Sequence, residues 1–327
     1  MTAVTAPPAV TFTIDPWDPG YGMAYSEEQD DVRLGPSSAE LDLDLEVPAA
    51  LWRPVDPDPA LRLPDTVLFL DGVRRIDARV WVHGKAPQPG TGIAASFAAG
   101  LVSCADTARI TEVAVERGLF TADPEAADIG TRHARYPARP ADGPGLDSLS
   151  VALQQHLTMA EVQLAMDYRA RTPAVDDLLV VDGPLRGRSH LHRTVGYIKT
   201  HHASYLPAEQ AAVVAVLLPG QRTPAFAMGT SWQRNSWYLQ LPGTPGVPWS
   251  GVVRLECSAD LPPQEAIRLA DLTARILPPL ASTPHKDPRA PQNLVPIGGL
   301  ERELRHRLGD QRLLYRALRS AAAAAQH

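Results

Sequence analysis

Two apolar stretches of this chain end in an aspartate that is followed at once by a glycine. The first, TVLFLDG, ends at Asp71 and Gly72, and the second, DLLVVDG, ends at Asp182 and Gly183. Short apolar runs bounded by turn residues predict buried β-strands. A carboxylate at the tip of a buried strand is costly to remove from water unless a cation or several hydrogen-bond donors meet it. The two stretches are therefore either two ordinary Asp-Gly turns or two halves of one cation site.

A third carboxylate, Glu161, lies within the segment that most strongly predicts a helix. Apolar residues recur at three- and four-residue spacing over 147–171, and Pro173 ends the pattern. Glu161 comes four residues after Leu157 and three before Leu164, so it projects from the core side of the helix or from its border. It is either a border residue whose carboxylate reaches water or a further acid directed at the site.

These three acids meet if the two strands are neighbours in one sheet and the helix packs across it. Converging carboxylates need a counter-charge. Oxygen ligands without a Cys/His cluster point to a hard cation, Mg²⁺ or Mn²⁺. Two such ions about 3.5–4 Å apart stabilise the attacking and leaving oxygens of a phosphodiester. Asp71, Glu161 and Asp182 therefore predict a metal centre for phosphodiester hydrolysis.

Basic residues follow both Asp-Gly pairs. Arg74 and Arg75 follow the first, and Arg186 and Arg188 follow the second. As isolated charges they would belong to solvated turns. Beside a metal centre they predict a positive rim that binds the DNA backbone.

The remaining elements predict an α/β protein, with a mixed RNase H-like sheet flanked by helices. Strands are expected at 66–71, 77–83, 92–104, 177–182, 194–200, 236–241 and 251–257, and helices at 147–171, 207–218, 263–276 and in the tail, with a break near Gly309. The expected domains are a small β-rich N-terminal appendage over 1–60, which contains the alternating stretch ELDLDLEV, and a nuclease domain over 61–327, with a loop or insertion at 120–146.

The bulk composition is that of an ordinary globular protein. Hydrophobic residues make up 44% and charged residues 21% of the 327 residues, and the formal net charge is −6. An acidic chain of this kind contacts nucleic acid only through local basic patches or a partner. Cys104 and Cys257 predict two reduced thiols. With no secretory signal pattern and no apolar run of about 20 residues, we expect a cytoplasmic protein that has no membrane partner.

The stretches that carry these acids resemble the NurA family of DNA repair nucleases. The matching pieces are FLDGV at Asp71, MAEVQLA at Glu161, LLVVDGPLRG at Asp182 and VGYIKTHH at Lys199, all within about 64–300. The resemblance implies a toroidal homodimer with an RNase H-like core. It also implies manganese-dependent endonuclease activity on single-stranded DNA and 5′-to-3′ exonuclease activity. The implied partner is HerA, a hexameric ATPase that moves duplex DNA toward the nuclease during end resection.

The same resemblance implies roles for individual residues. Asp71, Glu161 and Asp182 would bind the metal, and Lys199 would approach the scissile phosphate or its developing charge. The chain departs from the family near its C-terminus, where the position of a usual histidine falls at about Gly298. The candidates to replace that histidine are His285, Asp287 and Asn293, while His201 and His202 are interpreted as phosphate-side or surface residues.

Two other functions remain open at the level of the sequence. The missing histidine favours a non-catalytic subunit that threads DNA or assembles a HerA-type motor complex. A hydrolase that uses paired carboxylates on a sugar or another small substrate is the third alternative, and it would not need a metal. Because residues 1–50 are extra to the catalytic pattern, we expect them to contact the partner.

Overall fold

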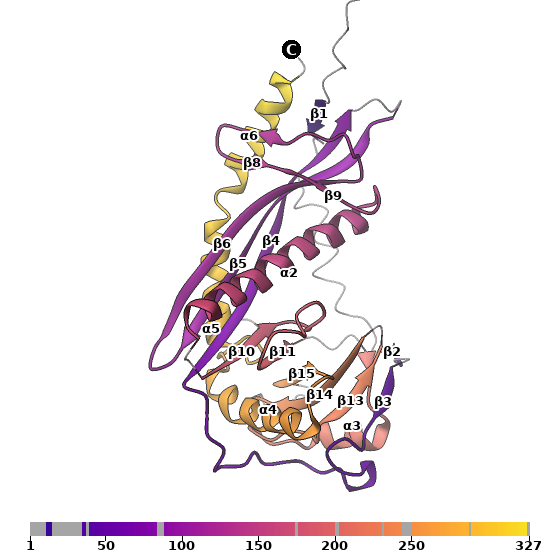
Figure 1. The fold of residues 1–327 in the computed structure, drawn as a ribbon, viewed down its shortest axis with the longest axis vertical. Coiled ribbons are helices and arrows are strands. Elements are labelled where there is room, and N and C mark those ends of the chain that lie inside the picture. The colour runs from indigo at the N-terminus through magenta and orange to yellow at the C-terminus, as the bar shows by residue number, and fades with distance from the viewer. Residues whose placement is uncertain are drawn as a thin grey trace, which may run out of the picture.

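The molecule is elongated, with three long strands in its upper part and a lobe of shorter strands below them (Figure 1). The computed structural model describes residues 11–14, 35–36, 39–83, 88–173, 176–199, 203–230, 232–243, 250–287 and 289–325. The C-terminus lies at the far end of the long strands from the lobe (Figure 1).

One mixed sheet runs through both parts. Its order is β3-β13-β14-β15-β11-β10-β4-β5-β6-β9, and β1 pairs with β4 off this path. The long strands are β4 (Thr66–His83), β5 (Gly90–Cys104) and β6 (Ala108–Thr121), which form an antiparallel meander. Strands β10 (Asp177–Asp182) and β11 (Thr194–Ile198) follow, with β10 parallel to both β4 and β11.

Strand β4 joins the two strands that we expected at 66–71 and 77–83. The polar stretch between them predicted a turn, but it continues the strand because its charges have partners inside the molecule. Asp77 is fully buried, and it accepts hydrogen bonds from Arg75 Nε at 2.8 Å, from the Tyr136 hydroxyl at 3.1 Å and from the Ser96 hydroxyl. Only a register irregularity between Ile76 and Ala78 marks the place.

The region after β5 differs most from the sequence expectation. Strand β6 occupies residues for which no element was expected. The expected loop at 120–146 holds the short strands β7 (Ile129–Gly130), β8 (Arg135–Tyr136) and β9 (Ala138–Pro140). Strand β9 pairs in parallel with the end of β6, so part of this loop extends the sheet.

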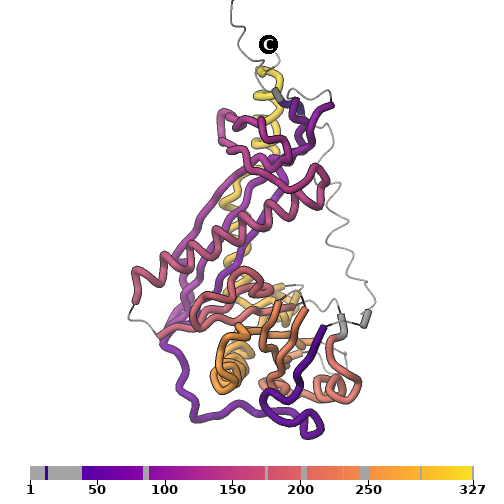
Figure 2. The backbone as a smooth tube through the Cα atoms, turned by 45° about the vertical axis from the view of Figure 1, so that its right-hand side comes forward, coloured from indigo at the N-terminus to yellow at the C-terminus, as the bar shows by residue number. Residues whose placement is uncertain are grey.

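Helices cover both faces of the long strands. On one face α2 (Leu146–Arg171) packs on a core that contains Leu68 and Leu70 of β4 and Val181 of β10. On the other face α5 (Val295–Arg307) packs on a core that contains Phe69 of β4. Figure 2 shows α2 along one side of the three long strands and the C-terminal helices on the other. Helix α6 (Gln311–Ala324) follows the expected break at Gly309, which has φ +82°.

The lower lobe contains the rest of the sheet. Its other strands are β13 (Phe226–Gly229), β14 (Gln233–Gln240) and β15 (Val252–Ser258), and its helices are α3 (Ala208–Ala215) and α4 (Pro263–Ile276). A short strand pair joins β2 (Gly35–Pro36) to β12 (Ala203–Ser204). The 3₁₀ turns are η1 (Ala49–Leu51) and η2 (Pro278–Leu280).

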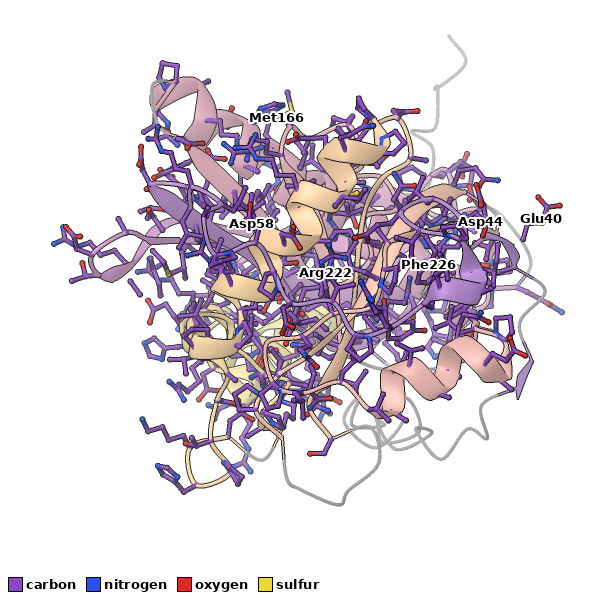
Figure 3. All side chains as sticks on the ribbon, turned by 90° about the horizontal axis from the view of Figure 1, so that it is seen from below. Glu40, Asp44, Asp58, Met166, Arg222 and Phe226 are labelled. Carbon is purple, nitrogen blue, oxygen red and sulfur yellow. The ribbon has the colours of Figure 1, made fainter. Side chains whose placement is uncertain are left out.

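Described parts of the N-terminal segment pair with the large sheet. Strand β1 (Thr11–Ile14) pairs with β4, and β3 (Glu40–Asp42) pairs with β13 at the far edge. In the interior of the lobe, the buried Arg222 makes ion pairs with Glu46 and Asp271 of α4 at 2.8 and 2.7 Å (Figure 3 labels Arg222). The division of the chain at residue 60 stays a prediction.

Within the described ranges, no helix combines the length and the apolar composition needed to cross a bilayer. Cys104 and Cys257 are both free thiols.

Candidate metal centre

Asp71 and Asp182 lie side by side where β10 ends. Strands β4 and β10 are parallel, and Leu70 pairs with Val181, so the next residue on each strand is the aspartate. Side chains alternate along a strand, which directs both carboxylates to the face that α5 covers, together with Phe69 and Val180. The structure therefore brings together the two aspartates that the sequence singled out.

Glu301 of α5 supplies the third carboxylate of the group. One oxygen of each of Asp71, Asp182 and Glu301 lies within 4.8 Å of the others. Asp71 Oδ1 accepts a hydrogen bond from the Gly72 amide at 2.7 Å, whereas its buried Oδ2 has no hydrogen-bond partner among the described residues. A buried carboxylate oxygen without a donor is costly, and a bound cation would satisfy it.

Close packing of α5 on the sheet brings Glu301 to this place. A Cβ on Gly100 of β5 would lie 2.7 Å from Leu300 Cδ1 and 2.9 Å from Leu304 Cδ2. A larger residue at 100 would therefore push α5 outward. Glu301 follows Leu300 at the border of the apolar stripe that anchors the helix.

Glu301 was missed in the sequence, although the argument used for Glu161 applies to it equally. Both are acids at the edge of an apolar helical stripe. Glu301 also comes one helical turn after Gly298, where the expected histidine is absent.

Three cations surround the acids and connect them. Lys199 Nζ donates to Asp182 Oδ2 at 2.6 Å and to Asn293 Oδ1 at 3.1 Å. Asn293 Nδ2 donates to Asp287 Oδ2 at 2.5 Å, and the guanidinium of Arg289 bonds both oxygens of Glu301. The third cation, Arg188, makes an ion pair with Glu161.

Glu161 lies near Asp71 but outside the compact group of three acids. It belongs to α2, which covers the opposite face of β4, and its carboxylate makes an ion pair with Arg188. A Cβ on Gly72 would lie 2.5 Å from Glu161 Oε1, so the absence of a side chain at 72 lets this carboxylate reach the strand next to Asp71. The compact group therefore contains Glu301 beside the two aspartates, and the role of Glu161 as a metal ligand stays a prediction.

The acids differ in how far nearby cations compensate their negative charge. Burial, followed by the charges of Asp182 and Glu301, raises the pKa of Asp71 well above its usual value. Burial also raises the pKa of Asp182, against the opposing effect of Lys199. For Glu301, the ion pair with Arg289 outweighs burial and lowers the pKa. The negative charge of Asp71 is therefore the least compensated of the three. A hard divalent cation bound through oxygen would compensate it.

A groove of about 950 Å³ opens beside the acids. Asp71, Glu161 and Asp182 line it together with Arg74 and Arg186. Arg74 Nη1 donates to Gln154 of α2 at 2.5 Å, and Arg186 is exposed. These two arginines lie where we expected a basic rim.

The other two expected rim residues are engaged inside the molecule. Arg75 pairs with the buried Asp77 and donates to the Gly309 carbonyl at 2.8 Å. The side chain of Arg188 is only 6% exposed, and it bonds Glu161. Ion pairs with buried carboxylates thus hold Arg75 and Arg188, although Arg188 also lines the groove, and contact of the four arginines with the DNA backbone stays a prediction.

The candidates for the missing histidine occupy different positions. Asn293 and Asp287 bond each other beside Lys199, and a Cβ on Gly298 would lie 3.1 Å from Asn293 Nδ2 and 3.2 Å from Asp287 Oδ2. His285 is exposed. His201 and His202 lie outside the described residues.

Comparisons with known proteins give one likeness to report. No family model matches the sequence, and no curated protein matches it. Among solved structures, the crystal structure of the NurA nuclease from Sulfolobus solfataricus aligns with 79% of this chain and 84% of that chain, at 10% sequence identity and a TM-score of 0.42. At this TM-score the likeness does not establish a shared fold.

Proposed function

We propose that this chain is a divalent-metal-dependent nuclease that hydrolyses DNA phosphodiesters. The observation that carries the proposal is the group formed by Asp71, Asp182 and Glu301, with the unpartnered Oδ2 of Asp71, beside a groove that arginines line. These three carboxylates would hold the ion. When bound, a divalent ion polarises a phosphoryl oxygen and lowers the pKa of water.

The residues around the acids supply binding and electrostatic stabilisation. Arg74 and Arg186 line the groove and would bind phosphates on either side of the reacting one. Lys199 is held at 2.6 Å from Asp182 and would stabilise negative charge that develops on the phosphate. Asn293, which is fully buried, fixes the position of the Lys199 ammonium.

The strand order supports an RNase H-like core for this enzyme. An antiparallel meander of β4, β5 and β6 is followed by a helix and then by two strands parallel to β4. The first aspartate comes from the first strand of the meander, and the second comes from the strand after the helix.

The finer parts of the proposal are supported by the motif resemblance around Asp71, Glu161, Asp182 and Lys199. They are manganese as the metal, single-stranded endonuclease and 5′-to-3′ exonuclease activity, a toroidal homodimer, and a cytoplasmic role in DNA end resection and repair with a HerA-type ATPase. The net charge of −6 favours an enzyme that receives DNA from a motor over one that binds DNA by its own overall field.

The alternative functions are less well supported. A non-catalytic threading subunit was suggested by the missing histidine, but Glu301 supplies a carboxylate one turn after that position. A metal-independent hydrolase acting on a small substrate leaves the unpartnered Oδ2 of Asp71 unexplained.

The experiment that tests the proposal is an assay of the purified chain on labelled single- and double-stranded DNA. Reactions with Mn²⁺, with Mg²⁺ and with a chelator are compared for the wild type and Asp182→Asn. We expect cleavage that needs the metal and is lost in the variant while its circular dichroism spectrum is unchanged. Cleavage that persists in the chelator, or in a folded variant, would contradict the proposal.

A further inference from the structure

Glu161 is the acid of the groove that the compact metal group leaves out. The side chains of Glu161 and Arg188 are 3% and 6% exposed, and their ion pair is buried. Arg188 is also held by the backbone, because it donates to the Pro184 carbonyl at 3.0 Å, and it reaches the Thr158 hydroxyl at 3.3 Å. The guanidinium is therefore fixed by contacts with α2 and with the loop that follows β10.

Arg188 pairs with the carboxylate that a second ion would need as a ligand, that of Glu161. Two-metal centres hold their ions about 3.5–4 Å apart and share a carboxylate between them. A second ion beside Asp71 on the α2 side would have to take its other carboxylate from Glu161, whose Oε1 lies against Gly72. Arg188 bonds Glu161 Oε2 and neutralises this carboxylate, so a second ion at Oε1 would bind a ligand whose negative charge is already compensated.

The charge balance of the centre points the same way. Among the described residues, the connected groups are the carboxylates of Asp71, Glu161, Asp182, Asp287 and Glu301 and the cations Arg188, Lys199 and Arg289. Five carboxylates and three cations leave a formal charge of −2, which one divalent ion neutralises. A second ion would leave two uncompensated positive charges in a largely buried site, and this is strongly unfavourable.

We infer that the centre binds one divalent ion, at Asp71, Asp182 and Glu301. In place of a second ion, the guanidinium of Arg188 neutralises the carboxylate of Glu161. The consequence for the reaction rests on the proposed function, whereas the metal stoichiometry does not. Arg188 acts here as a positioning residue that sets the composition of the centre and keeps a fixed positive charge on the α2 side of the groove.

The inference is tested by Mn²⁺ binding to the full chain without DNA. Isothermal titration calorimetry counts the ions, and low-temperature electron paramagnetic resonance distinguishes an isolated Mn²⁺ from a spin-coupled pair. The wild type should bind one ion and give an uncoupled spectrum. Arg188→Met frees Glu161 and should bind two ions with a coupled spectrum, whereas the matched control Arg186→Met, at an exposed groove position, should still bind one.

A second pair of variants keeps the test decisive if Arg188→Met does not fold. Glu161→Gln should still bind one Mn²⁺ with an uncoupled spectrum, because Glu161 does not contact the ion. Asp71→Asn should weaken binding by more than about 100-fold, beyond what changes outside the ligand set usually cost.

The outcomes separate the two levels of the claim. Two coupled ions in the wild type would overturn the inference and leave the metal centre and the nuclease in place. A single ion in a folded Arg188→Met protein would also overturn it, because Arg188 would then not be what excludes the second ion. Binding of no ion at all would remove the metal centre and with it the proposed function.

Discussion

Asp71 differs from the acids around it because no side chain of the described residues donates a hydrogen bond to its Oδ2. Asp182 has Lys199, Glu161 has Arg188 and Glu301 has Arg289. Burial, before the neighbouring charges, raises the pKa of Asp71 well above its usual value, and burial also raises the pKa of Asp182 and of Glu161. The metal-free protein is therefore sensitive to pH at these acids, and among them Asp71 has the oxygen with no donor in the described part of the chain.

The stabilisation by metal should therefore depend on pH. Because the pKa of Asp71 is raised in the folded state, the metal-free protein loses stability as the pH rises from the usual aspartate range through the folded pKa. A divalent ion replaces the proton, so it stabilises more at pH 8 than at pH 5. At 100 times Kd we expect about 2.7 kcal/mol, or roughly 5 °C in Tm, at pH 8. Differential scanning fluorimetry with Mn²⁺ and chelator measures it, and a shift that does not change with pH would contradict it.

Glu301 should be as necessary as the two aspartates. Glu301→Gln removes a charge from the ligand group and leaves Arg289 with only the longer contact to Asp287, so we expect cleavage to fall by at least about 100-fold. Glu303→Gln is the matched control, because Glu303 lies on the same helix and pairs with Arg307 at the surface. Single-turnover cleavage rates measure both. A Glu301 variant with the wild-type rate would show that α5 contributes no ligand.

Among the elements, α2 and α5 position the acids Glu161 and Glu301, because each helix packs closely on the sheet at a glycine. Gly100 admits α5, and Gly72 admits α2 at the position of Leu157 and Glu161. Some strand positions must be glycine because a helix packs directly on them. In a sequence, such a glycine looks the same as a glycine in a turn. Gly72 itself was interpreted as part of an Asp-Gly turn, whereas it lies within the continuous strand β4.

Substitution of Gly72 should test this packing directly. In Gly72→Ala the new Cβ would lie 2.7 Å from Leu157 Cδ1 and closer still to Glu161, so α2 must shift. We expect a loss of about 1–3 kcal/mol in the free energy of unfolding. Gly130→Ala, where a Cβ would meet nothing within 4 Å, should change it by less than about 0.5 kcal/mol. Urea unfolding followed by circular dichroism compares them, and equal effects would contradict the close approach.

At the scale of the whole molecule, the N-terminal segment is joined to the lobe by the pairing of β3 with β13 and by the buried Arg222. The side chain of Arg222 is 1% exposed, and it bonds both oxygens of Glu46 at 2.8 and 2.9 Å and also Asp271. Residues 39–60 therefore pack as part of the lobe.

Removal of the Glu46 carboxylate should destabilise the whole chain. Glu46→Ala leaves the buried guanidinium with only Asp271, and breaking one side of such a buried pair costs about 3 kcal/mol. The control is Glu40→Ala, because Glu40 is exposed on the edge strand (Figure 3). Thermal unfolding should show a lower Tm for the first variant alone. Equal Tm values would mean that the contact adds nothing to stability.

The class of fold and half of the site could be predicted from the sequence, because both depend on local patterns. Apolar runs gave the strands that carry Asp71 and Asp182, and three- and four-residue spacing gave α2 and α4. The continuity of β4 could not be predicted, because it depends on Asp77 finding Ser96 and Tyr136 from distant strands. The place of Glu301 depends on how α5 packs on β5, which no local pattern records.

The three acids of the centre also come from widely separated parts of the chain. Positions 71, 182 and 301 are separated by 111 (182 − 71) and 119 (301 − 182) positions along the sequence. An ion held by all three acts as a removable cross-link that closes two long loops, and closing loops of this length restricts the unfolded chain far more than the folded one. The metal-loaded protein should accordingly resist proteases much longer than the metal-free one, so a chelator should also loosen the fold.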